Sequence, residues 1–223
     1  MTRTKLCDRN LPSYTKGEEI FNMSSHIVGA GLGIAALVLC VLTSVMHSDV
    51  WAVVSSAIYG SSLILLYTAS SVYHGLRPGM AKKVMQVVDH CTIYFLIAGT
   101  YTPILLCSIR KASPTVAWVL FGIVWGVSTI ATVFTAIDLK KYSKFSMICY
   151  IGLGWCIVIA SKIAIEAVHM NGLILLLLGG IAYTVGAVIY GLGKKHRYMH
   201  SVFHLFVVAG SVLHFFCVLL YVI

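Results

Sequence analysis

Seven long apolar stretches recur along the sequence and leave few alternatives for the fold. The hydrocarbon core of a bilayer is about 30 Å thick, and an α-helix of roughly 20 apolar residues crosses it. The connections between the stretches are too short for a second domain. The sequence therefore predicts an all-α membrane protein, a seven-transmembrane-helix bundle over residues 23–223 preceded by a short segment, residues 1–22. The expected helices cover residues 23–46, 51–74, 88–108, 115–137, 145–167, 171–192 and 199–222.

The composition supports a membrane protein over a soluble one. Hydrophobic residues make up 59% of the chain and charged residues 10%, whereas soluble domains are about half apolar and a quarter charged. The net charge of +9 would suit a nucleic-acid-binding protein, but the basic residues lie in short loops between the apolar stretches. We therefore expect membrane lipids, and no nucleic acid, as partners. The sequence carries no signal for an oligomeric state.

The placement of Lys and Arg predicts the orientation, because these residues collect in cytoplasmic loops. Of the 16 basic residues, only Arg110, Lys111 and Lys162 fall on the side opposite to the N-terminus. The N-terminus is therefore expected in the cytoplasm and, after seven spans, the C-terminus outside. The residues on the cytoplasmic side are Arg3, Lys5, Arg9, Lys16, Arg77, Lys82, Lys83, Lys140, Lys141, Lys144, Lys194, Lys195 and Arg197.

Three histidines in the apolar stretches have the spacing of a metal site. His200 and His204 lie four residues apart at the start of the last helix, so they project from one helical face. His74 ends the second helix, which the topology places at the same cytoplasmic depth. Three imidazoles with an open fourth position for water are typical of catalytic zinc sites. A single histidine in a membrane helix is more simply explained by a hydrogen bond to a neighbour, but three at one depth favour a metal.

Other polar residues are expected at this same depth. Asp89 begins the third helix and could take a proton from a metal-bound water or orient it. Ser70 lies one turn before His74 and could hydrogen-bond that water or a developing oxyanion. Because ionisable groups inside a membrane are costly, their default interpretation is functional. Three more polar residues lie just before the first helix or within its first turns: Glu19, Asn22 and His26.

These residues also form three motifs that resemble those of the hemolysin III family. That family is the bacterial branch of the progestin and adipoQ receptor group, which shares a superfamily with the alkaline ceramidases. The resemblance extends from the first helix to the last. The motifs are E-x-x-N-x-x-x-H at Glu19, Asn22 and His26, S-x-x-x-H followed by Asp at Ser70, His74 and Asp89, and H-x-x-x-H at His200 and His204.

The resemblance implies a role for each motif. In receptor relatives, the histidines matching His74, His200 and His204 bind zinc, and the aspartate matching Asp89 contacts the zinc-bound water. The serine matching Ser70 lies near the metal, and the first motif would support the site. The resemblance also implies a multi-pass protein of the bacterial plasma membrane.

Four classes of function remain open at this point, one of them a transporter that uses the histidines as a proton relay, although no repeat of discontinuous helices is visible. The metal motif and the ceramidase relationship favour a zinc-dependent hydrolase of a lipid amide or ester. A non-enzymatic sensor or regulator of membrane lipid state, with structural zinc, is the main alternative. A cytolytic pore-former is what the family name suggests, but seven apolar spans do not provide the soluble form that a secreted pore-former needs.

Two further features carry structural predictions. His214 lies ten residues beyond His204, about 15 Å along the helix and off its face. It is too distant to be a metal ligand, and we expect a helix–helix hydrogen bond or a place in the lining of a cavity. Gly29 and Gly33 form G-x-x-x-G, which permits close packing of helices within the bundle.

Overall fold

The computed structural model describes residues 3–47, 49–193 and 196–223. Its seven long apolar helices confirm the seven predicted spans. The third begins at Met80 and not at residue 88, so Asp89 lies inside that helix and does not begin it. Lys194 and Lys195, which the orientation prediction includes, lie outside the described residues. Five spans are single helices: α1 (Lys16–Met46), α2 (Val50–Gly75), α5 (Pro114–Ile137), α8 (Met170–Leu192) and α9 (Met199–Tyr221). The third span joins α3 (Met80–Pro103), the π-helical η2 (Ile104–Ile109) and α4 (Arg110–Ala112), and the fifth joins α6 (Ser143–Gly154), η3 (Cys156–Ala160) and α7 (Ser161–Ala167).

Helix α1 begins at Lys16, earlier than the apolar stretch that predicted it. Thr15 caps the helix: its side chain accepts a hydrogen bond from the Glu18 backbone N–H, and the Glu18 carboxylate accepts one from the Thr15 N–H at 2.8 Å. This reciprocal pair satisfies backbone donors that the first helical turn leaves free. Because the helix begins this early, Glu19 and Asn22 belong to α1, and the helix determines the direction in which their side chains leave the backbone.

Two spans are irregular inside the apolar region, and in the fifth span the free backbone groups find partners. The fifth span breaks between α6 and η3. There the Tyr101 hydroxyl donates to the Gly154 carbonyl at 2.9 Å and accepts from the Ile157 N–H at 3.1 Å. Broken helices are tolerated within a membrane only where such groups are satisfied by protein or water.

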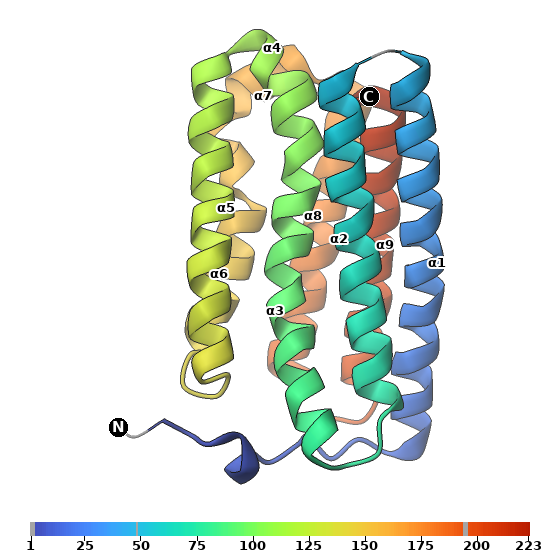
Figure 1. Ribbon diagram of the computed structural model, residues 1–223, viewed down its shortest axis with the longest axis vertical. Helices are drawn as coiled ribbons and strands as arrows, with labels where there is room; N and C mark the ends of the chain where they lie inside the picture. Colours follow the sequence, from blue (N-terminus) through green and yellow to red (C-terminus); the bar gives the residue numbers. More distant parts are fainter. Residues whose placement is uncertain (1–2, 48, 194–195) are drawn as a thin grey trace.

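Figure 1 shows the arrangement of the spans, with α3 between the α1–α2 side and the α5–α6 side. The third span is the most buried of the seven. Large apolar side chains cover the outer faces, as at Val28 and Ile148, which are 69% and 71% exposed. An apolar exterior of this extent suits lipid contact, because soluble proteins rarely expose large continuous apolar patches.

The close approach of α1 and α2 confirms the predicted role of Gly29 and Gly33. A Cβ atom at Gly29 would overlap the Tyr67 ring, and one at Gly33 would lie 2.9 Å from the Ile64 backbone nitrogen. The G-x-x-x-G motif therefore serves packing within the chain.

The N-terminal segment, with the 3₁₀ turn η1 (Leu6–Asp8), runs along the end of the bundle where α1 begins (Figure 1). Arg3 Nε donates to the Ile137 carbonyl at 2.9 Å, and the Thr4 N–H donates to the Asp138 carboxylate at 2.8 Å. The hydrogen bond from the Thr4 N–H is the main cause that lowers the pKa of Asp138 to about 2. The segment is thus fixed to the end of α5.

Candidate metal centre

His74, His200 and His204 converge at the end of the bundle where α1 and α9 begin. The Nε2 atoms of His74 and His200 are 3.3 Å apart, and those of His200 and His204 are 3.1 Å apart. Nitrogen ligands at about 2.0–2.1 Å from a tetrahedral zinc ion lie roughly 3.3 Å from one another. His74 and His204 are buried and His200 is half-buried. The group could therefore hold a metal ion.

Glu19 determines which nitrogen of His74 is available. Its Oε2 lies 2.7 Å from His74 Nδ1, so the ring donates Nδ1–H to the carboxylate. The neutral imidazole then has its lone pair on Nε2, which faces the other two histidines. A carboxylate behind a metal-binding histidine is a common way to fix the tautomer and the direction of the ring.

Lys82 completes this arrangement, although its place in the sequence predicts only a charge in a cytoplasmic loop. Its Nζ lies 2.8 Å from Glu19 Oε1, and the residue is 2% exposed. The two oxygens of Glu19 are therefore divided between a histidine and a lysine. The sequence gives little indication of this role, because lysines near the end of a span normally indicate only the orientation of the protein in the membrane.

The start of α9, which carries His200 and His204, is held by α1. Tyr198, just before the helix, has a left-handed backbone with φ of 61°, and its N–H donates to Glu18 Oε1 at 2.7 Å. One turn further along α1, the Asn22 side chain accepts a hydrogen bond from Ser201 at 2.7 Å. Asn22 therefore supports the position of the two histidines from beside them.

His26 lies against the group, in a different relation to it. Its ring stacks on that of His204 with centroids 3.7 Å apart and an angle of 16°, and both its ring nitrogens are buried without a hydrogen-bond partner. The lone pair of an imidazole nitrogen lies in the plane of the ring, so two nearly parallel stacked rings cannot direct lone pairs at one ion. In this arrangement His26 is excluded as a ligand to a metal shared with His204.

We therefore expect His26→Phe to retain bound metal. Phenylalanine preserves a flat ring for stacking on His204 but has no nitrogen, so metal content should equal that of the wild type. Metal analysis of the detergent-purified protein checks this. A loss of metal as large as that caused by His204→Ala would show that His26 is a ligand.

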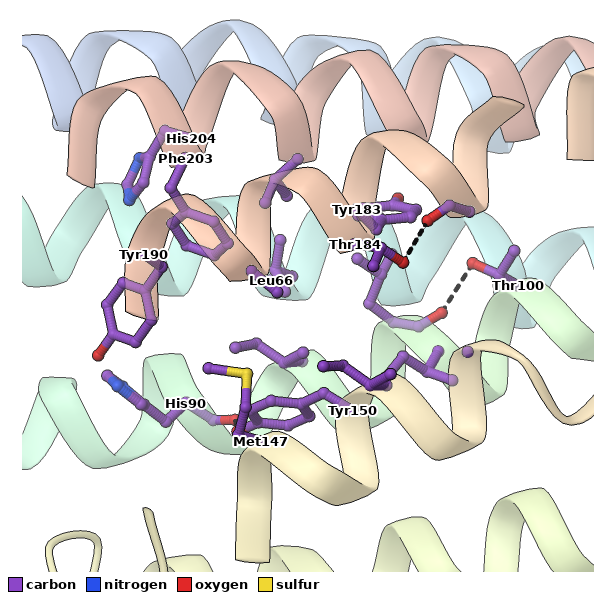
Figure 2. A pocket seen from close by; sticks show the side chains of 18 of the residues that line it. Leu66, His90, Thr100, Met147, Tyr150, Tyr183, Thr184, Tyr190, Phe203 and His204 are labelled. Carbon is purple, nitrogen blue, oxygen red and sulfur yellow. Dashed lines mark hydrogen bonds between the residues drawn. The ribbon is translucent and has the colours of Figure 1, made fainter. Parts of the chain in front are cut away.

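A cavity of about 170 Å³ begins at the histidines and runs between α2, α3, α6, α8 and α9. Figure 2 shows His204, Tyr190 and His90 at one end and Thr100 and Thr184 at the other. Most of its lining is apolar. The space is large enough for several water molecules or part of a hydrocarbon chain.

Asp89 and Ser70 lie at the histidine end of this cavity. Both line it together with His26, His200 and His204. The structure thus brings together the polar residues predicted from α1, α2, α3 and α9.

His214 also lines the cavity, at a distance from the metal-binding histidines that excludes it as a ligand, as its spacing predicted. Its Nε2–H donates to the Leu176 carbonyl of α8 at 3.0 Å, and its ring meets the edge of Tyr183. Both expected roles, a helix–helix hydrogen bond and a place in the cavity wall, are confirmed.

Tyr14 covers the histidines from the N-terminal segment. Its ring stacks on His200 with centroids 4.9 Å apart and an angle of 16°. Burial is the main cause that raises the pKa of Tyr14 well above its usual value. The sequence does not single out Tyr14, because this residue stands in a polar stretch before the first predicted span.

Comparison with known proteins gives consistent matches over this region. A family model described as Haemolysin-III related matches residues 14–215, which include every residue of the candidate site. The chain is 40% identical over 206 residues to Hemolysin-3 of Bacillus cereus, with 92% of each chain covered. It is 38% identical over 208 residues to a Hemolysin-3 homolog of Bacillus subtilis, covering 93% of this chain and 96% of the relative. Monocyte to macrophage differentiation factor of Homo sapiens is 26% identical over 208 residues, covering 90% of this chain and 83% of the relative.

Proposed function

Because the chain belongs to the haemolysin-III-related family and is a multi-pass membrane protein, we propose that it is a zinc-dependent hydrolase of an amide or ester bond in a membrane lipid. One observation carries this proposal. Three convergent imidazole nitrogens, a carboxylate and a hydroxyl stand at the end of an apolar cavity inside the bundle. Perturbed or paired polar groups that converge on an apolar cavity are the usual sign of a binding or active site.

Zinc is the metal that these residues suit best. Imidazole binds zinc, copper, iron and nickel, and the ligand type and geometry discriminate among them. Three histidine nitrogens with a free fourth position are typical of catalytic zinc. A bound zinc ion would supply a Lewis acid and a water molecule of lowered pKa.

Asp89 and Ser70 are the proposed catalytic residues. Asp89 would take the proton of the attacking water and return it to the leaving nitrogen or oxygen, which is general acid–base catalysis. The Ser70 hydroxyl, which lines the cavity beside Asp89, would donate to the substrate oxygen as negative charge develops there. The apolar cavity would hold the hydrocarbon chain and keep bulk water from the reacting bond.

The proposed site lies near the cytoplasmic face of a bacterial plasma membrane. The orientation follows from the asymmetric distribution of Lys and Arg, and the membrane from the bacterial relatives. Under this proposal the substrate is a lipid that reaches the site from the inner part of the bilayer.

The proposal is tested by release of fatty acid from defined lipids. Detergent-purified protein is incubated with one N-acyl amide and one acyl ester of the same chain length, and the product is measured by mass spectrometry. We expect turnover by the wild type and a loss of about 10²-fold or more in Asp89→Asn, since general acid–base catalysis contributes 10²–10⁴-fold. Zinc content should be equal in both proteins, because Asp89 is not one of the three histidines that could bind the metal.

Absence of fatty acid release by zinc-loaded wild type would contradict the hydrolase. A non-enzymatic sensor with structural zinc predicts a different pattern. In that case Asp89→Asn would retain zinc, fold and biological activity together.

A further inference from the structure

Lys82 occupies an unusual position for a lysine near the end of a membrane span. It lies in the first turn of α3, yet it is 2% exposed. Its Nζ donates to Glu19 at 2.8 Å, to the Leu76 carbonyl at 3.0 Å and to the His74 carbonyl at 3.3 Å. An ammonium group has three donors, so each has a partner of its own.

These partners connect three helices at one point. His74 and Leu76 stand at the C-terminal end of α2, where the last carbonyls of a helix lack partners within it and favour a positive charge. Glu19 comes from α1 and Lys82 from α3. The Lys82 ammonium also lies 5.0 Å from the centre of the Tyr73 ring. A buried ammonium is stable only when it is paired in this way.

Glu19 stands between Lys82 and His74, with one oxygen for each. Its Oε1 accepts from Lys82, and its Oε2 accepts from His74 Nδ1. Without Lys82, the carboxylate would lose the partner that fixes its rotation, and its charge would be half-buried without compensation. The His74 ring would then lose the constraint that directs Nε2 at the other histidines.

We propose that Lys82 is a positioning residue for the metal centre and acts through Glu19 on His74. This inference rests on the proposed metal binding but not on the proposed hydrolysis. Lys82 itself contacts no metal-binding nitrogen. It supports the site in the way that carboxylates and their partners support metal-binding histidines elsewhere, where mutation typically weakens metal affinity by 10–100-fold.

The test compares Lys82→Met with Lys83→Met. Methionine keeps an unbranched side chain without charge. The neighbouring Lys83 donates to the Cys7 carbonyl of the N-terminal segment and is a matched control. Zinc affinity is measured by competition with a chromophoric chelator in detergent, and the Co²⁺-loaded proteins are compared by visible absorption. We expect about 10–100-fold weaker zinc binding and an altered cobalt spectrum in Lys82→Met, with neither change in Lys83→Met.

A double-mutant cycle with Glu19→Gln tests the route of the effect. If Lys82 acts through Glu19, then Lys82→Met should weaken binding no further in the Glu19→Gln background. This pair also removes both buried charges together, so it keeps the test valid if Lys82→Met alone does not fold. A further loss of affinity in the double variant, relative to Glu19→Gln alone, would overturn the proposal.

The remaining outcomes separate this inference from the proposed function. A wild-type protein that binds neither Zn²⁺ nor Co²⁺ would overturn the metal site and, with it, the role of Lys82. A wild type that binds zinc while Lys82→Met binds it equally well would overturn the role of Lys82 alone. Lipid hydrolysis is not measured here, so its failure cannot be confused with either result.

Discussion

Replacing His204 with alanine should reduce the bound zinc of the purified protein from about one ion per chain to background. The change removes one of three nitrogens that lie within 4.8 Å of one another and could hold a metal ion. Changes to outer partners of metal ligands typically cost 10–100-fold in affinity, so the loss of a ligand should exceed 100-fold. Elemental analysis of protein purified in detergent, before and after dialysis against a weak chelator, measures it.

The matched control is His47→Ala. His47 is exposed at the opposite end of α1 and contacts its own helix through the Thr43 carbonyl. It should keep the full zinc content. Thermal unfolding gives a second readout, because a ligand at 1,000 times its Kd stabilises the folded state by about 4 kcal/mol. Added zinc should therefore raise the Tm of His47→Ala but not that of His204→Ala. A wild-type protein that contains no zinc after purification and binds none when zinc is added would contradict the metal site.

The spans and the depth of the site could be predicted because they depend on long-range averages along the sequence. Seven apolar stretches give seven helices, and the direction of each helix gives the end at which His74, Asp89 and His200 lie. The i, i+4 spacing of His200 and His204 is a local property. These signals need no knowledge of side-chain packing.

The partners within the site could not be predicted in the same way. Whether Lys82 faces water or Glu19 depends on how α1 and α3 meet, and hydropathy scores lysine the same in both cases. The stack of His26 on His204 depends on the rotation of α1. The early start of α1 depends on the capping pair of Thr15 and Glu18, in a stretch that is too polar to count as a span.

The close packing of α1 on α2 makes Gly60 the glycine whose replacement should damage the fold most. A Cβ atom there would lie 2.5 Å from Leu37 Cα and 2.8 Å from the Leu37 backbone nitrogen. Because the obstacle is backbone, no rotamer change relieves it, and the two helices must separate. We expect Gly60→Ala to lower the free energy of unfolding by about 3 kcal/mol, at the upper end of overpacking.

Gly31→Ala provides the control on the same helix pair. Gly31 is exposed on α1, and a Cβ atom there would meet nothing within 4 Å. Alanine has the better helix propensity by about 1 kcal/mol, so this variant should be as stable as the wild type or slightly more stable. For a chain of this size the expected loss in Gly60→Ala corresponds to a Tm lower by roughly 6–12 °C, measured by thermal unfolding of the metal-free proteins in detergent. Equal Tm values for the two variants would mean that α1 and α2 are not held together as closely as the contact at Leu37 requires.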